Sequence, residues 1–376
     1  MTGFRFITVV LSLTFCAVTG CTPVMKTSKL PDGFMVRKLA KADPGTPFAV
    51  NRTGSLAAVS EGAIEVIDRE GTARPIAQGA ATALCFSPSG DKLAAALPAG
   101  QKTILRMFDS EGKVIGEATV PEPVTSIAWR SEKQVLAAAL AINKHTFGSE
   151  LATILYLWDG SNPPVATPLN SVTVRPHVAA MPKEALLQSL NMAVSPYGDE
   201  IAYTTLKDPP MFNPYLRIVT RHIESGSERE VGKTSMGSGG PLYTPDGESL
   251  VVGDMDSLTR RLAIPDGKEL DAWPFPGSYP ALSPSGAYIF LDGRLYLKSR
   301  EVASFPPEAR AAFLPDGSGI ALSYQGDLYL LSGLKDQPAP ALQADMERLL
   351  KLRRLRSMGL ISEKEYRAAK AKGTAR

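Results

Sequence analysis

The chain has 376 residues, a formal net charge of +3 and an apolar content of 44%. More than 300 residues of largely apolar repeats are ample for a core that needs no cross-links. Three cysteines are too few for a disulfide framework and exclude a disulfide-stapled secreted scaffold.

Residues 1–20 are expected to be a signal peptide. Arg5 precedes an apolar run over residues 6–18, which is too short to span a bilayer as a helix. The run ends in Val18-Thr19-Gly20-Cys21, which resembles the bacterial lipobox. The resemblance implies cleavage between Gly20 and Cys21 and a diacylglycerol on Cys21. An ordinary signal peptide followed by a chance cysteine is the alternative.

The residues after this box bear on localisation. Thr22, rather than Asp, follows Cys21, which by the sorting pattern of Gram-negative lipoproteins favours the outer membrane, facing the periplasm. Residues 21–33 are expected to form a short tether. Cys16 would leave with the signal peptide, so Cys85, in an apolar strand, would be a buried free thiol. Because the protein is expected to be exported to the cell envelope, we expect no nucleic acid among its partners.

A short phrase recurs through the rest of the chain: an apolar strand end, then Ser/Thr-Pro-x-Gly, then another apolar run. Ser or Thr at the first position, Pro at the second and Gly at the fourth are typical of a type I turn. Each copy therefore predicts a tight hairpin between two buried strands. The copies and their variants are 51–54, 87–90, 195–198, 244–247, 283–286 and 314–317.

The spacing of these hairpins predicts the architecture. The phrase returns about every 40–45 residues, with further short strands between copies, which is the period of a β-propeller blade. A degenerate unit lies around residues 127–139. Seven units account for residues 34–335, and six or eight blades also fit. The fold class is therefore an all-β, seven-bladed β-propeller with a small C-terminal α-helical hairpin.

The phrase resembles the WD40-like repeat of TolB-type periplasmic propellers and of prolyl-oligopeptidase relatives. Trp158-Asp159 matches the WD dipeptide of WD40 proteins, although their histidine-containing tetrad is absent. The chain also lacks the N-terminal α/β domain of TolB and the hydrolase domain of the peptidases. The resemblance implies a propeller in the cell envelope and carries no activity over, because propellers host many unrelated functions.

Ring closure needs a strand from the other end of the chain. The last unit supplies only three strands, and residues 34–39 form an orphan strand before the first unit. We expect these residues to be the fourth strand of the last blade, which removes both free sheet edges. Both chain ends would then meet at one blade, with the tether beside the C-terminal tail.

Residues 336–344 are expected to be a linker and residues 345–376 a pair of helices. Gly359 suits a helix C-cap, and Ser362 with Glu365 forms a capping box. The tail resembles the SHOCT module, a short C-terminal helical hairpin, which implies oligomerisation or docking. It holds ten Lys and Arg against four Asp and Glu, while residues 21–344 carry a net −4. The tail could dock on an anionic surface, on its own acidic blades or on another protein, or stay solvated.

Three insertions and one aromatic crossover are expected on the face opposite the tight turns. Long loops on a rigid scaffold often carry function, and Met and aromatic side chains favour protein interfaces. The same side chains could instead cap the open ends of blades. The candidate partner-binding residues are Lys144, His145, Phe147, His177, Met211, Phe212, Trp273 and Phe275.

No catalytic constellation, metal motif or cofactor loop is present in the sequence. There is no G-x-S-x-G elbow, and the three histidines His145, His177 and His222 lack metal-ligand spacing. The sequence favours a non-catalytic scaffold that binds an envelope protein or polymer. The alternative is a propeller enzyme of the lactonase or glycan-lyase type, with its site in the central channel.

Overall fold

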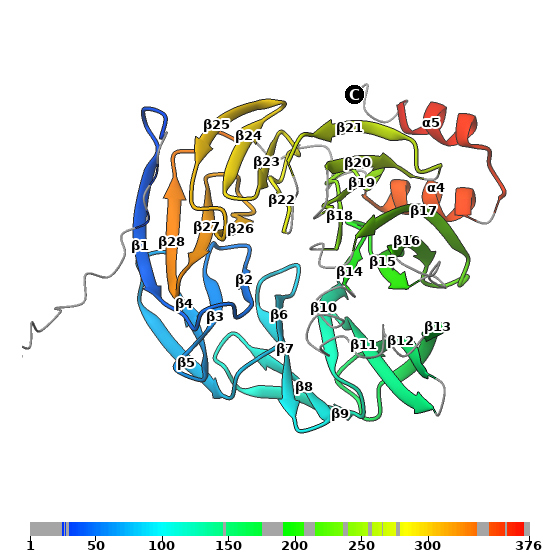
Figure 1. Ribbon diagram of the computed structural model, residues 1–376, viewed down its shortest axis with the longest axis horizontal. Helices are drawn as coiled ribbons and strands as arrows, with labels where there is room; N and C mark the ends of the chain where they lie inside the picture. The colour runs from blue at the N-terminus through cyan, green and yellow to red at the C-terminus, as the bar shows by residue number, and fades with distance from the viewer. Residues whose placement is uncertain are drawn as a thin grey trace, which may run out of the picture.

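Seven four-stranded antiparallel sheets form a ring around a central channel in the computed structural model (Figure 1). The structure describes residues 25, 27, 30–145, 148–174, 191–206, 215–235, 240–254, 258–264, 266–275, 279–336, 346–357 and 359–371. The prediction of a seven-bladed β-propeller is confirmed.

The first four blades follow one another along the chain, and within each blade successive strands are neighbours. Blade 1 consists of β2(Phe48–Val50), β3(Leu56–Ser60), β4(Ala63–Ile67) and β5(Ala73–Gln78). Blade 2 consists of β6(Ala83–Phe86), β7(Lys92–Ala99), β8(Lys102–Asp109) and β9(Val114–Val120). Blade 3 consists of β10(Val124–Ser131), β11(Gln134–His145), β12(Gly148–Trp158) and β13(Val165–Val174). Blade 4 consists of β14(Met192–Val194), β15(Glu200–Leu206), β16(Tyr215–His222) and β17(Glu228–Ser235).

The remaining blades complete the ring, and two helices follow. Blade 5 consists of β18(Pro241–Tyr243), β19(Ser249–Val252), β20(Thr259–Ala263) and β21(Glu269–Trp273). Blade 6 consists of β22(Ala281–Leu282), β23(Tyr288–Leu291), β24(Arg294–Leu297) and β25(Arg300–Ser304). Blade 7 consists of β26(Arg310–Phe313), β27(Gly319–Tyr324), β28(Asp327–Ser332) and, from the other end of the chain, β1(Met35–Lys41). The helices are α4(Met346–Ser357) and α5(Glu363–Ala371), and no helix among the described residues is long and apolar enough to cross a bilayer.

The recurring phrase forms the turn between the first two strands of a blade. In blade 4, the Gly198 N–H donates to the Ser195 carbonyl at 2.9 Å, which closes the turn. Gly198 has φ +70°, and a Cβ there would lie 2.4 Å from the Arg130 carbonyl oxygen of blade 3. Glycine is therefore needed for the backbone conformation and for the close approach of the neighbouring turn.

Apolar clusters between neighbouring blades hold the ring together. The cluster between blades 2 and 3 contains Trp129 and Trp158 of blade 3 and the small residues Ala94 and Ala96 of blade 2. Trp158 is 1% exposed and its indole N–H donates to the Ser161 carbonyl at 2.8 Å. Large side chains on one blade and alanines on the next let the sheets approach closely. A cluster of this kind occupies each of the seven interfaces.

Strand β1 closes the ring as the sequence predicted. It pairs antiparallel with β28, with Met35 opposite Ser332 and Lys41 opposite Asp327. Lys38 also forms an ion pair with Asp327 at 2.7 Å. Blade 7 therefore has the fourth strand that its own end of the chain lacks, and its outer edge is paired.

The helical hairpin forms as predicted, but its position differs from the expectation that it lies beside the N-terminal segment. The Gly359 N–H caps α4 by donating to the Arg356 carbonyl, and the Ser362 hydroxyl and Glu365 carboxylate form the capping box at the start of α5. Figure 1 shows both helices over blades 4 and 5, across the ring from β1. The chain leaves blade 7 at Asp336, whose carboxylate accepts from the Ser285 N–H of blade 6 at 3.0 Å. This contact directs the chain away from the N-terminal strand.

Candidate functional site

The propeller has two faces with different loops. The tight-turn face carries the turns that join first to second and third to fourth strands in each blade. The crossing face carries the second-to-third hairpins and the connections between blades. Of the insertions identified in the sequence, residues 143–150 span the end of β11 and the start of β12, at the crossing face. Residues 207–214, between β15 and β16, and the part of residues 174–190 beyond the end of β13 lie outside the described residues.

Among the described residues, the two middle strands of blade 3 are the longest of any blade and extend toward the crossing face. Strand β11 has 12 residues and β12 has 11, whereas the longest corresponding strands of blade 2 have 8. The pairing continues to the tip, where His145 lies opposite Gly148. Four more residues at 3.3 Å each make this arm about 13 Å longer than its neighbour.

The two faces of the arm differ in polarity. Ile142, Leu151 and Val172 lie opposite one another on one face, which continues the side of the sheet that packs on blade 4. Asn143, Glu150 and Thr173 occupy the other face. The arm is therefore amphipathic.

Two of the eight predicted partner-binding residues lie on this arm. The structure places Lys144 and His145 at the tip of β11. Four others lie outside the described residues, namely Phe147, His177, Met211 and Phe212.

The other two predicted residues lie between blades 5 and 6. Trp273 is 7% exposed and belongs to the apolar cluster of this interface, with its indole nitrogen buried and without a partner among the described residues. Phe275 packs against the same cluster and stacks on Tyr296 with ring centroids 5.6 Å apart. The guanidinium of Arg294 covers the Phe275 ring at 4.4 Å. The structure therefore gives Trp273 a packing role and leaves Phe275 at the crossing-face margin.

On the tight-turn face, Arg353 attaches the helical hairpin to blades 4 and 5. This side chain of α4 is 2% exposed. Its Nε donates to the Asp199 carboxylate at 2.8 Å and its Nη1 to the Gly247 carbonyl at 3.0 Å. Its guanidinium lies 4.5 Å from the centre of the Tyr197 ring. One arginine thus joins a helix to the tight turns of two blades.

The positive charge of Arg353 is compensated by the negative charge of Asp199. Burial disfavours the charged form of Asp199, yet the Arg353 guanidinium and the Ser195 hydroxyl hold the pKa of its carboxyl below the usual value. Burial also raises the pKa of Tyr197 to about 12, so its hydroxyl stays protonated and donates to the Asp246 carbonyl at 3.1 Å. Two of the three guanidinium nitrogens of Arg353 are thus hydrogen-bonded, while Nη2 is buried without a partner among the described residues.

Helix α5 adds a second contact on blade 5. Lys370 forms an ion pair with Glu248 at 2.8 Å, and the Tyr366 hydroxyl donates to the same carboxylate at 3.3 Å. Tyr366 is 1% exposed, and Arg356 covers its ring at 4.3 Å. Of the surfaces considered for the basic tail, its own acidic blades are the one that it contacts.

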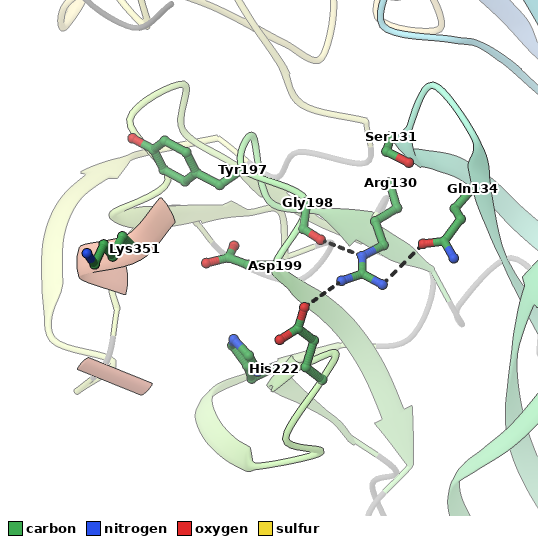
Figure 2. A pocket seen from close by; sticks show the side chains of 9 residues that line it. Arg130, Ser131, Gln134, Tyr197, Gly198, Asp199, His222 and Lys351 are labelled. Atoms are coloured by element: carbon green, nitrogen blue, oxygen red, sulfur yellow. Dashed lines mark hydrogen bonds and ion pairs between the residues drawn. The ribbon is translucent and has the colours of Figure 1, made fainter. Parts of the chain in front are cut away.

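A hollow of about 500 Å³ lies beside the docked hairpin, between blades 3 and 4 (Figure 2). Arg130 crosses it, donating to the Gly198 carbonyl at 2.9 Å, the Gln134 amide oxygen at 3.2 Å and the Glu224 carboxylate at 3.4 Å. Lys351 of α4 forms part of the rim. The hollow is lined by Arg130, Ser131, Gln134, Tyr197, Gly198, Asp199, His222, Glu224 and Lys351.

The histidine of the hollow is held in one tautomer. The backbone N–H of Ser225 donates to His222 Nδ1 at 3.2 Å, so the proton of the neutral ring is on Nε2. His222 is 6% exposed. Its fixed ring offers a hydrogen-bond donor, and the residues around it pair acid with base. The Ser225 hydroxyl also lies 3.1 Å from His222 Nδ1, and the arrangement can bind a polar group.

Within the described ranges, no three of His, Cys, Asp and Glu gather in a way that could hold a metal ion. The lone described thiol, Cys85, lies in β6, and burial raises its pKa to about 11. A thiol with so high a pKa is a poor nucleophile at neutral pH.

Sequence reasoning missed the role of Arg353. The composition shows that the tail is basic, but it does not distinguish any one of its ten Lys and Arg residues from the others. A local indication exists, because Arg353 follows Leu349 by four residues and therefore shares its helical face. Leu349 is 9% exposed, so a charge four residues later lies on a buried stripe of the helix. Its partners on blades 4 and 5 lie more than 100 residues away and have no local signature.

Comparison with known proteins shows a likeness of fold. No family model matches the chain, and no curated protein matches it. The β-propeller domain of Cps50 (Swd1) of Myceliophteria thermophila is similar, with 18% identity, a TM-score of 0.53, and coverage of 80% of this chain and 99% of that one. Hydrazine synthase of Kuenenia stuttgartiensis is similar, with 13% identity, a TM-score of 0.54, and coverage of 84% of this chain and 100% of that one. These likenesses support the propeller and nothing finer.

Proposed function

We propose that this protein is a lipid-anchored cell-envelope propeller that binds a protein or polymer partner without catalysis. The observation that carries the proposal is the arm of blade 3, which extends the crossing face beyond the neighbouring blades. Propellers serve many functions, so the repeated blades do not indicate which one this protein has. A blade that differs from the others is the better guide to function. Blade 3 is such a blade.

The arm has the chemistry of a contact surface. Its apolar face includes Leu151 and its polar face includes Asn143, whose amide donates to Glu150 at 3.3 Å. The connections that follow β11 and β15 in the sequence contain Phe147, Met211 and Phe212, which lie outside the described residues and are of types enriched at protein interfaces. A rigid, twisted ribbon presents such side chains without a large loss of conformational entropy on binding.

The location in the envelope rests on the lipobox-like sequence at Cys21. Acylation there would hold the molecule at a membrane, and Thr22 favours the outer membrane of a Gram-negative cell. A role of the hairpin in oligomerisation would use the side that stays exposed in the docked state, where Leu360 is 63% exposed.

Crosslinking in intact cells, followed by capture from membranes, tests the binding role. Changing Phe147, Met211 and Phe212 together to Ser should abolish capture, since each buried apolar anchor contributes about 1–3 kcal/mol. Tyr197 on the tight-turn face is unsuited as a control, because it supports Arg353. The exposed Asp91 in the tight turn of blade 2 is better, and Asp91→Ser should leave capture unchanged. Equal capture by the triple variant and the parent would reject this surface.

A further inference from the structure

The N-terminal segment does not leave the propeller where β1 begins. Met25, inside the stretch expected to be a tether, is 5% exposed and joins the apolar cluster between blades 6 and 7. Leu30 and Phe34 pack against the same cluster. Met25, Leu30 and Phe34, all ahead of β1, therefore lie against the propeller.

A contact of Met25 shows at which face of the propeller it lies. Its backbone N–H lies within hydrogen-bonding reach of the Tyr329 hydroxyl. That hydroxyl also donates to Asp327 at 3.2 Å, and Asp327 is the first residue of β28, beside the hairpin on the crossing face. Met25 thus lies at the crossing-face end of blade 7.

This position limits how far the propeller can move from an anchor at Cys21. Four residues separate Cys21 from Met25, and an extended chain of four residues spans at most about 14 Å. That distance is shorter than a single domain is wide. An acyl chain on Cys21 would therefore keep the crossing-face end of blade 7 close to the lipid surface.

The nearby surface has side chains suited to lipid headgroups. We call it the 6–7 margin and define it as Phe275, Tyr279, Arg294, Glu308 and Arg310. Tyr279 is 39% exposed and the guanidinium of Arg310 covers its ring at 4.2 Å. Arg294 covers Phe275 in the same way at 4.4 Å.

At a membrane surface, aromatic rings suit the boundary with the apolar acyl chains, and guanidinium groups bind the phosphates of the headgroups. Arginines stacked on aromatic rings therefore suit this environment. The opposing charge on the margin is the exposed Glu308, and Arg294 also lies 3.6 Å from Glu301. The margin is thus not simply basic.

We propose that the short anchor and the 6–7 margin together hold the crossing face of blades 6 and 7 against the phospholipid headgroups. This inference rests on the lipid anchor of the proposed function and adds the orientation of the propeller. The tight-turn face, with the docked hairpin, then points away from the membrane.

Fluorescence quenching of the full-length mature protein tests this orientation. A bimane label is placed at Glu308→Cys on the margin or at Ser299→Cys, an exposed residue of the turn between β24 and β25 on the tight-turn face of the same blade. Cys85 does not compete for the label, because burial raises its pKa to about 11. The protein is reconstituted into vesicles of phosphatidylethanolamine and phosphatidylglycerol that contain headgroup-spin-labelled lipid.

The label at Glu308 should be quenched several-fold more strongly than the label at Ser299. Equal quenching, or stronger quenching at Ser299, would overturn the orientation.

A lengthened anchor separates the two contributions. An insert of about 25 Gly and Ser residues between Val24 and Met25 has an r.m.s. span of roughly 25–30 Å and removes the distance limit. The Glu308 label should still be quenched more than the Ser299 label, and Tyr279→Ser with Arg310→Gln in this background should abolish the difference. Complete loss on lengthening alone would reject the headgroup contact.

The mass of the mature protein separates failure of this inference from failure of the anchor. A mature chain without an acyl mass on Cys21 would reject the anchor and the orientation together. An acylated chain with equal quenching at the two labels would reject the orientation alone.

Discussion

The guanidinium of Arg353 donates to the carboxylate of Asp199 at 2.8 Å across 154 residues of sequence. The pair joins the C-terminal hairpin to the tight turn of blade 4, and the Gly247 carbonyl of blade 5 accepts from the same side chain. Asp199 and Gly247 belong to successive copies of the repeated turn. The hairpin is therefore docked on the repeat itself, at two neighbouring blades.

Arg353→Ala should release the hairpin. Removing one partner of a buried ion pair costs about 3–5 kcal/mol, because the other charge is left unpaired. Limited proteolysis should then cleave the tail many times faster, while tryptophan emission stays native, since Trp129, Trp158 and Trp273 all lie in the propeller. Lys351→Ala, an exposed residue of the same helix, is the matched control. Equal protection of the tail in both variants would contradict the role of Arg353.

Docking of the hairpin should fail in acid. The pKa of Asp199 is lowered in the folded state, so its contribution is present above the unfolded value of about 3.9 and is lost as pH falls through the lower folded value. Protection of the tail from proteolysis should be constant between pH 5 and 8 and should decline only below about pH 4. Arg353→Ala should lack this transition. Release of the tail near pH 6 in the parent protein would implicate another group.

Deletion of β1 should destabilise the whole ring. A chain that begins after Ala42 leaves the β28 edge unpaired and loses the apolar contacts of Leu39 and Ala40 with blade 1. We expect aggregation or a loss of cooperative thermal unfolding, followed by near-ultraviolet circular dichroism. Met35→Ser, a change at the most exposed side chain of the same strand, should leave the transition near that of the parent. A melting curve unaffected by the deletion would show that closure does not depend on β1.

Cys21→Ser should move the protein from the membrane fraction to the soluble envelope fraction. The change removes the thiol that would carry the acyl chains, and the propeller does not use that thiol. Cell fractionation with immunodetection measures the outcome, and Cys16→Ser, within the expected signal peptide, is the control. A Cys21→Ser protein that is processed yet stays in the membrane would disprove the lipid anchor.

Local chemistry explains what the sequence could predict. The turn phrase determines its own hydrogen bond, as between Gly247 and Thr244 at 2.7 Å, and each copy marks a blade without reference to the rest of the chain. The capping box of Ser362 and Glu365 is local in the same way. The pairing of β1 with β28 joins segments that are far apart in the sequence. It could still be predicted, because the last blade lacked a fourth strand and the orphan strand could supply it.

What the sequence could not predict depends on contacts between distant side chains. Neither Met25 in the 6–7 interface nor Arg353 on Asp199 belongs to a repeat, and no rule of closure constrains either residue. The predicted binding surface on the crossing face stays a prediction, since four of its eight residues lie outside the described residues. It could not separate Trp273, which fills an interface, from Phe275, which reaches the margin, because both lie in one short aromatic crossover.

Pairing of β1 with β28 also makes the last step of folding wait for the end of the chain. Met35 and Ser332 are 297 residues apart, so at 5–20 residues per second β1 is synthesised roughly 15–60 s before its partner. Six blades can pair their strands locally in the meantime, while the seventh needs a strand pairing between the two ends of the propeller. The rate of ring closure, rather than the formation of any blade, then determines how long an open sheet edge is exposed to other chains.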